Sequence, residues 1–298
     1  MTIQEAFENF ILSRRLADLS PKSIYDYTCF IAPFVDSVGR NKPINEVQQT
    51  DINRYIEKLL NRQISKNTLA TYIRNVKVFL KWCSENFDVQ YTYSKIKVPK
   101  TYKKKVKLYS DQELFEIFER IHTESEWLTL RNKCIVALML DSGLRQSEVC
   151  TLERKNVSYS NMTLVVCGKG CKERTVPLGS LACRFLREYL EKCPYKSKYV
   201  FCGRRGNRLT TDAVKKFMHK LANELPYELS SHKLRHNFAT NYCLDQYEER
   251  GQMDVYKLMV LMGHENLSTT RRYMHQANEV IASKNNISHL DKVFSGVN

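Results

Sequence analysis

A lysine-rich segment without acidic residues divides this sequence into two parts, and the division limits the folds that are open to the chain. Residues 95–110 contain no Asp or Glu and carry seven lysines around Pro99. The segment is either a solvated linker or a strap across a phosphate backbone, and both interpretations mark a domain boundary. We therefore predict a first domain over residues 1–95, a basic linker over 96–107 and a second domain over 108–298.

The first ninety residues place apolar side chains at the three- and four-residue spacing of amphipathic helices. Ser20 followed by Pro21 is typical of a helix start, because proline fits the first helical position. Thr50 is expected to cap a later helix. We predict a compact all-helical domain of four helices, whose inner faces are Ile3, Phe7, Phe10 and Ile11; Ile24, Tyr27, Ile31, Phe34, Val35 and Val38; Ile52, Tyr55, Ile56, Leu59 and Leu60; and Leu69, Tyr72, Ile73, Val76, Phe79, Leu80 and Cys83.

The second domain is predicted to be largely helical as well. Ser110 and Glu113 match a capping box at the start of a helix. The apolar run 134–140 predicts another helix, which stops at Gly143. Further helices are expected over residues 144–152, 211–221, 231–244, 255–262 and 268–275, with a tail from residue 279.

A β-hairpin is expected in the middle of the second domain. Residues 163–167 and 174–178 flank the turn Gly168-Lys169-Gly170, which places Lys169 near the hairpin tip. Arg145 is expected in the first turn of the helix over 144–152. The sequence therefore predicts a mainly α chain with a small β-sheet, made of a helical domain and a mixed α+β domain.

Charge favours a polyanionic partner. The 298 residues carry 47 Lys and Arg against 32 Asp and Glu, a net charge of +15. Such a balance suits a polyanion through counterion release, although an anionic membrane surface or simple solubility explains it equally well. With 43% hydrophobic residues, the chain is long enough to bury a substantial core.

Targeting signals and the spacing of the cysteines limit where the protein can be located and which metals it can bind. The start Met1-Thr2-Ile3-Gln4-Glu5 lacks a basic and apolar leader, and no apolar stretch approaches membrane-spanning length. We predict a soluble cytoplasmic protein. The ten cysteines are scattered, and Cys167 and Cys171 lack a second pair at zinc-ligand spacing. Reduced and mostly buried thiols are therefore expected, with no metal.

A tyrosine surrounded by cationic residues is the main chemical signal. Tyr273 follows the pair Gly263-His264 and two arginines, after the box His232-Lys233-Leu234-Arg235-His236. Each residue alone has an ordinary explanation, such as an exposed arginine or a half-buried packing aromatic. A phenol has a pKa near ~10, so a tyrosine nucleophile needs nearby cations or a base. An anion that would hold such a cluster together is a phosphodiester.

These motifs resemble the tyrosine recombinase and integrase family, at the two-domain size of Xer-type members. The resemblance spans both domains, and its two most specific elements are the histidine box and the Leu261-Met262-Gly263-His264 motif with the nucleophile that follows it. It implies a recombinase that cleaves and rejoins DNA through a 3′-phosphotyrosine bond. The four matching elements, in order, are Gly143-Leu144-Arg145-Gln146-Ser147-Glu148, Gly168-Lys169-Gly170, His232-Lys233-Leu234-Arg235-His236, and Leu261-Met262-Gly263-His264 followed by Thr269-Thr270 and Tyr273.

The resemblance also implies a role for each residue. Arg145 and Arg235 would clamp the equatorial oxygens of the phosphorus, since planar guanidinium groups suit bidentate contact. His264 would add a hydrogen bond. In family terms, His232 assists proton removal from Tyr273, and Lys169 protonates the departing 5′ oxygen.

Two further side chains are assigned supporting roles. Glu148 resembles the acidic partner that orients active-site groups, although an ordinary surface ion pair explains it equally well. His236 is expected to support the site, whereas His275 is expected outside it. His232 and Arg235 are three residues apart and share a helix face. No cofactor is expected, because neither a phosphate-binding glycine loop nor a magnesium-binding carboxylate cluster is evident.

The partners follow from the same resemblance. The domains are expected to clamp duplex DNA, and the active form is a homotetramer on two sites, joined by exchange of the C-terminal tail, with accessory DNA-bending proteins as possible partners. If the basic linker is a strap, its DNA-binding residues are Lys100, Lys103, Lys104, Lys105 and Lys107.

The subfamily is left open by the sequence. Residues 245–254 form a charged stretch longer than the short turn expected in housekeeping Xer-type members, and the arm-binding domain of larger phage integrases is not evident. Integration and excision of a mobile element, or DNA inversion, is the first interpretation, and chromosome dimer resolution is the second. A type IB topoisomerase and a DNA-binding regulator with a silent site are the rival classes.

Overall fold

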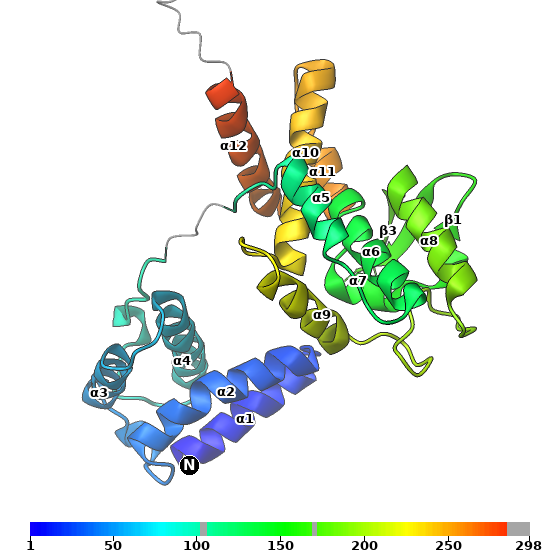
Figure 1. Ribbon diagram of the computed structural model, residues 1–298. Coiled ribbons are helices and arrows are strands. Elements are labelled where there is room, and N and C mark those ends of the chain that lie inside the picture. Colours follow the sequence, from blue (N-terminus) through cyan, green and yellow to red (C-terminus); the bar gives the residue numbers. More distant parts are fainter. Residues whose placement is uncertain (102–105, 169–171, 285–298) are drawn as a thin grey trace, which may run out of the picture. The chain divides into compact units, whose positions relative to one another are not determined.

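The computed structural model describes residues 1–101, 106–168 and 172–284. The chain divides into two compact units, Met1–Lys104 and Lys105–Asn298 (Figure 1). Lys169 falls outside the described residues, as do Lys103, Lys104 and Lys105 of the basic linker and the end of the tail.

The first unit is built from four helices, as the apolar spacing predicts. They are α1 (Ile3–Leu16), α2 (Pro21–Val38), α3 (Gln49–Leu60) and α4 (Lys66–Asn86), with short 3-10 turns at Ile44–Glu46 and Tyr93–Lys95. Ser20 accepts a hydrogen bond from the amide of Ser23, and Pro21 opens α2, as expected. Edge-to-face aromatic contacts such as Phe10 with Phe79, at 5.5 Å, fill the core between the helices.

Two details of the third helix differ from the prediction. Thr50 does not cap α3, because the helix begins at Gln49, two residues before the start that a Thr50 cap implies, and Gln48 forms a capping box with Asp51. Leu60 is 60% exposed, because the adjacent Leu59 occupies the inward position and consecutive residues lie about 100° apart around a helix.

The second unit begins with helices and then a small sheet. Helix α5 (Asp111–Glu119) starts with the predicted Ser110 and Glu113 capping box. Helices α6 (Glu126–Asp141) and α7 (Gln146–Thr151) follow. The strands β1 (Val157–Ser158), β2 (Thr163–Cys167) and β3 (Glu173–Pro177) form an antiparallel sheet in the order β1-β2-β3, which confirms the expected hairpin.

After the sheet, the described residues of the second unit contain further helices. They are α8 (Ser180–Lys192), α9 (Thr211–Asn223), α10 (Ser231–Arg250), α11 (Val255–Met262) and α12 (Leu267–Lys284). The bounds of α11 agree with the prediction. The expected end of α10 at residue 244 is wrong, because the helix continues through the charged stretch until Gly251 adopts a left-handed conformation.

The last helix is also longer than expected. Helix α12 continues to Lys284, so residues 279–284 are helical rather than part of a tail. Helices α10, α11 and α12 lie side by side (Figure 1) around a small core that includes Phe238, Met262, Tyr273 and Ala277. The burial of Ala277 one turn after Tyr273 keeps this face of α12 against its neighbours.

A larger core lies under α6, α8 and the sheet. It includes Leu138, Val166, Leu186 and Phe201. Most cysteines in the described part are buried thiols: Cys83, Cys134, Cys150, Cys183, Cys202 and Cys243. Among the helices that the structure describes, none combines the length and apolarity needed to cross a membrane.

Candidate active site

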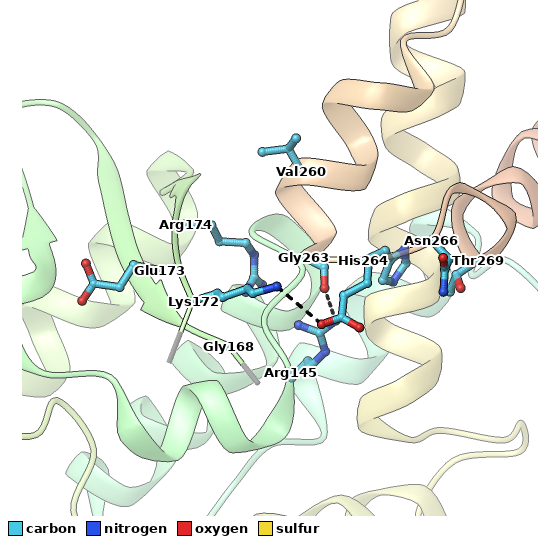
Figure 2. A pocket seen from close by; sticks show the side chains of 11 residues that line it. Arg145, Gly168, Lys172, Glu173, Arg174, Val260, Gly263, His264, Asn266 and Thr269 are labelled. Atoms are coloured by element: carbon cyan, nitrogen blue, oxygen red, sulfur yellow. Dashed lines mark hydrogen bonds and ion pairs between the residues drawn. The ribbon is translucent and has the colours of Figure 1, made fainter. Parts of the chain in front are cut away.

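A cavity of about 420 Å³ on the second unit brings together side chains that are far apart in the sequence. They come from the turn before α7, the first turn of α10, the turn between α11 and α12, and α12 itself. A neighbouring pocket of about 520 Å³ shares Arg145, His264 and Thr269 with it (Figure 2). The side chains around the first cavity are Arg145, Gln146, Ser231, His232, Arg235, His264, Thr269, Arg272 and Tyr273.

Arg145 is the N-cap of α7 rather than a residue of its first turn. Its backbone amide donates to Oε2 of Glu148 at 2.7 Å, because a glutamate three residues into a helix reaches back to the cap. Its Nη1 donates to Oε1 of Glu148 at 2.8 Å, and its Nη2 donates to the carbonyl of Gly263 at 2.9 Å. Glu148 is only 2% exposed, so this contact is not a surface ion pair.

Arg174 is a second partner of Glu148 that the sequence did not indicate. Its Nη1 and Nη2 donate to the two carboxylate oxygens at 2.7 and 2.9 Å. Burial raises the pKa of Glu148, but the hydrogen bonds and charge of Arg174 and Arg145 outweigh it and hold the pKa at about 2. The sequence offered one indication that the Arg174 side chain points inward. Residue 174 lies two positions before the buried Val176, so both side chains lie on the same face of β3.

Arg235 is buried at the start of α10, with 6% of its surface exposed. Its guanidinium donates to the carbonyls of Gly143 and Met262, and its Nη1 lies 3.8 Å from Oε2 of Glu148. Burial first, and then the charge of Arg145, lower its pKa to about 9. A guanidinium in this position is stabilised by a further anion.

Tyr273 is packed into the wall of the site. The residue is 1% exposed, and its hydroxyl oxygen accepts a hydrogen bond from Nη2 of Arg272 at 2.7 Å. The ring of His236 meets the tyrosine ring edge-on at 4.7 Å, and the ring of His264 lies nearly parallel to it at 6.1 Å. Arg272 is the second residue of the site that sequence reasoning left without a role.

The histidines of the site are held in their neutral form. Burial, followed by the surrounding arginines, lowers the pKa of His264 to about 4, and burial with Arg272 does the same for His236. Burial and Arg272 also lower the pKa of His232. Near neutral pH these imidazoles are therefore uncharged, and each has a ring nitrogen that can accept a hydrogen bond.

Gly263 allows two guanidinium groups to pack against the backbone. Its φ is +58°, a left-handed conformation that favours glycine. A Cβ at this position would lie 3.1 Å from Nη1 of Arg174 and 3.3 Å from Nη1 of Arg145, and all three residues line the pocket of Figure 2. The glycine thus permits both the turn and the close approach of the arginines.

The remaining predicted residues either do not line these cavities or fall outside the described part. Lys169 and the linker residues Lys103, Lys104 and Lys105 cannot be placed. Lys100 is exposed, and Lys107 donates to Oε1 of Glu113 at 2.7 Å. His275 is exposed and does not line the cavity. In the described ranges, no group of three His, Cys, Asp or Glu side chains is arranged to hold a metal ion.

The charge balance of the two cavities favours an anion with several oxygens. Arg145, Arg174 and Arg235 surround the buried carboxylate of Glu148, and Arg272 lines the cavity that holds Tyr273. A guanidinium group can bind two phosphate oxygens at once, and Tyr273 lines the same cavity as Arg145, Arg235 and Arg272. The arrangement suits attack of a phenol oxygen on a phosphodiester.

Comparisons with known proteins cover most of the chain. Residues 108–279 match the phage integrase family, and residues 7–86 match the phage integrase N-terminal SAM-like domain. A protein named tyrosine recombinase XerC from Halalkalibacterium halodurans is 32% identical over 277 residues, which are 86% of this chain and 87% of the relative. XerC of Psychromonas ingrahamii is 28% identical over 97% of this chain and 94% of its own length.

Solved structures share the fold at lower identity. The Tn1549 transposon integrase in complex with circular intermediate DNA has a TM-score of 0.73 at 17% identity, over 92% of this chain and 95% of that one. The XerH site-specific recombinase bound to a palindromic difH substrate has a TM-score of 0.73 at 21% identity, over 95% of this chain and 84% of that one. These likenesses bear on the fold alone.

Proposed function

This chain belongs to the phage integrase family and is a tyrosine-type site-specific DNA recombinase, and from that premise we propose that Tyr273 attacks the scissile phosphate. The observation that carries the proposal is the cavity at which Tyr273 meets Arg145, Arg235, His232 and His264.

In the proposed reaction, the oxygen of Tyr273 forms a bond to phosphorus while the bond from phosphorus to the 5′ oxygen breaks. Arg145 and Arg235 stabilise the charge that develops on the other phosphate oxygens. The neutral imidazole of His232 takes the phenol proton, and Lys169 gives a proton to the 5′ oxygen. The product is a 3′-phosphotyrosine, which a second 5′ hydroxyl attacks to rejoin the strands.

His264 and Glu148 complete the proposed site. Nδ1 of His264 and Oγ1 of Thr270 lie 2.9 Å apart, which orients the imidazole so that its other nitrogen is available to the phosphate. Glu148 fixes Arg145 through its two contacts. His236 supports the tyrosine ring by packing against it.

The proposed assembly is a homotetramer on two double-stranded DNA sites. One unit of each protomer binds the core of the site, the basic linker contacts phosphates, and the C-terminal tail joins neighbouring protomers. DNA-bending accessory proteins are compatible with this arrangement. Cleavage by this route requires neither a metal nor ATP.

Two biological roles are proposed in order. Integration, excision or inversion of a mobile DNA segment comes first, supported by the charged stretch that extends α10 to Arg250 beyond the turn expected in Xer-type members. Chromosome dimer resolution comes second, and the names of the curated XerC relatives support it.

The nucleophile is tested by trapping the covalent intermediate. The DNA site is first obtained by binding-site selection with the whole protein, and a nick is then placed beside the scissile phosphate so that the cleaved strand diffuses away. We expect the wild-type protein to form a covalent DNA adduct and Tyr273→Phe to bind the same DNA without forming it. An adduct with Tyr273→Phe would refute the assignment.

The biological roles are separated by recombination assays in cells. A plasmid with two selected sites in direct or inverted orientation reports excision and inversion, and a strain without its own XerC reports dimer resolution. Recombination on the plasmid without rescue of the strain supports the first role. Rescue of the strain supports the second.

A further inference from the structure

We propose that Arg174 is a positioning residue for DNA cleavage: it fixes the carboxylate of Glu148, and through that carboxylate it fixes Arg145. The inference rests on the proposed site, in which Arg145 contacts the scissile phosphate. Arg174 itself is assigned no contact with DNA. It lies on β3, which pairs with β2, and Lys169 falls between these two strands in the sequence.

Arg174 joins three elements of the second unit through one side chain. Its Nε donates to the carbonyl of Leu261, in the last turn of α11, at 2.7 Å. Its two terminal nitrogens donate to Glu148 on α7 at 2.7 and 2.9 Å. The Arg174 side chain is 7% exposed. The hairpin, α7 and the end of α11 are therefore held at fixed positions relative to one another.

The two oxygens of Glu148 are both shared with Arg145. Oε1 accepts from Nη1 of Arg174 at 2.7 Å and from Nη1 of Arg145 at 2.8 Å. Oε2 accepts from Nη2 of Arg174 at 2.9 Å and from the backbone amide of Arg145 at 2.7 Å. Because a bidentate pair allows one orientation of the carboxylate, Arg174 determines where Glu148 can hold the Arg145 guanidinium.

The shape of the site suits arginine at this position. A lysine has a single nitrogen, so it cannot bind both oxygens of Glu148 and also reach the carbonyl of Leu261. Gly263 leaves room for the guanidinium, since a Cβ there would meet Nη1 of Arg174 at 3.1 Å. The role therefore requires both the charge and the planar fork.

Charge is the second part of the role. The charged groups that face Glu148 are Arg145 from the turn before α7, Arg174 from β3 and Arg235 from α10. His264, beyond Gly263, is held neutral near pH 7 by burial and by these arginines, which lower its pKa to about 4. Burial raises the pKa of Glu148, and hydrogen bonds with Arg174 are the largest opposing influence.

Loss of Arg174 should therefore make cleavage depend on pH. Without Arg174, burial of Glu148 is opposed mainly by Arg145, and the pKa of Glu148 rises from about 2. As the pH falls through this raised pKa, Glu148 takes up a proton and Arg145 loses its anionic partner. Cleavage by the variant should then fail at acidic pH and recover as the pH rises.

The test compares four proteins in adduct formation on the nicked substrate between pH 5.5 and 9. Arg174→Met should cleave about 10- to 100-fold more slowly than wild type near neutral pH, the usual effect of removing an orienting partner, and should recover in part toward pH 9. Arg174→Lys keeps the charge, so its pH profile should follow wild type at a reduced rate. The double variant Arg174→Met with Glu148→Gln should not show the pH response of Arg174→Met, because glutamine cannot take up a proton in this range.

Arg131→Met is the matched control. Arg131 is a half-buried arginine of the same unit that donates to the carbonyl of Cys202 at 2.9 Å and lies outside the two cavities of the site. Its substitution removes a comparable contact and should leave both the rate and the pH profile of cleavage unchanged. DNA binding in gel shifts and a cooperative melting transition verify the fold of every variant.

Several outcomes would overturn the inference. A folded Arg174→Met protein with the wild-type rate at every pH removes any positioning role, and a loss that is equal at every pH indicates structural support only. If Arg174→Met does not fold, Arg174→Lys decides, because a wild-type rate for this variant contradicts the need for the fork. Adduct formation by Tyr273→Phe would instead refute the proposed site itself, so the two failures are distinguishable.

Discussion

The hydroxyl oxygen of Tyr273 accepts a hydrogen bond from Nη2 of Arg272, its neighbour in the chain, at 2.7 Å. Adjacent residues of a helix normally point in different directions. The contact is possible because the Arg272 guanidinium folds back over the tyrosine ring, with Cζ 4.8 Å from the ring centroid. The proposed nucleophile is therefore held beside a permanent cation before any DNA is bound.

We expect Arg272→Ala to slow cleavage by about 10-fold or more, because a charge-assisted hydrogen bond to the attacking oxygen is lost. The measurement is the single-turnover rate of adduct formation on the nicked substrate with the protein in excess. Arg271→Ala is the matched control, since Arg271 is the exposed preceding residue. Equal rates for the two variants would show that the Arg272 contact has no part in cleavage.

Lys169 is predicted to be the general acid. Lys169→Ala should slow cleavage of ordinary DNA by about 10²-fold or more. When sulfur replaces the bridging 5′ oxygen, the leaving group needs no proton, so the variant should approach the wild-type rate. Lys172→Ala is a suitable comparison, because Lys172 is an exposed lysine of the same hairpin, with Nζ 3.8 Å from Oε1 of Glu265. Equal impairment of Lys169→Ala on both substrates would remove Lys169 from this role.

Local patterns predicted much of the fold. The bounds of α11 follow from Asp254, which caps its start, and from Gly263, which ends it with a positive φ. The capping box of α5 and the β2–β3 hairpin also depend on residues close in sequence. The length of α10 does not, because its last turns are supported by Gln246, whose side chain accepts from the amide of Asp254 at 2.8 Å after the helix has ended.

Sequence motifs named side chains that meet at the cavity of Tyr273, but they did not indicate contacts that tertiary packing alone creates. Arg174 binds Glu148 and Leu261, which are 26 and 87 residues away in sequence. An arginine on a short strand is usually solvated, so nothing local distinguishes it. Arg272 was overlooked for a related reason, since a residue adjacent to the nucleophile is expected to point elsewhere.

Because two histidines are buried in their neutral form, we predict that the folded protein becomes less stable as the pH falls. The pKa values of His236 and His264 are about 4 in the folded protein, below the ordinary value of about 6.5. Between these values the unfolded chain binds protons that the folded chain does not, so the free energy of unfolding decreases as the pH falls through this window. We expect the thermal midpoint to decrease from pH 7 to pH 5 in differential scanning calorimetry.

A double substitution tests this origin. His236→Gln with His264→Gln should flatten the dependence of the thermal midpoint on pH, whatever its effect at a single pH. His219→Gln is the control, because His219 is exposed on α9. An unchanged slope in the double variant would show that other groups cause the loss in acid.

The basic linker makes a quantitative prediction about DNA binding. If Lys103, Lys104 and Lys105 each contact a phosphate, replacing all three with glutamine should reduce the slope of log affinity against log salt by about 0.9 per contact. Replacing Lys192 and Lys198, which pair with Glu126 and Glu153, should leave the slope unchanged. An unchanged slope for the triple variant would mean that the segment is only a linker.

The helix that carries Tyr273 sets the position at which the C-terminal tail can be tested. Helix α12 extends to Lys284, and Ala277 is buried within it, so a truncation that spares the helix must fall after Lys284. The removed segment, 285–298, lies outside the described residues and carries Ile287, Leu290, Val293 and Phe294. These apolar groups either fold back on their own protomer or dock on a neighbouring one.

Docking on a neighbour is our expectation, because it would link protomers into a closed ring and couple their sites. The protein truncated after Lys284 should bind a single site and form the covalent adduct, but should not pair two sites or exchange strands. Native gel shifts with two labelled sites and a recombination assay measure these steps. In the full chain, Leu290→Glu should likewise prevent pairing and strand exchange, and Ser288→Glu is its control. If the tail instead folds back on its own protomer, its removal should lower the thermal midpoint of the monomer. Normal strand exchange by the truncated protein would refute the docking role.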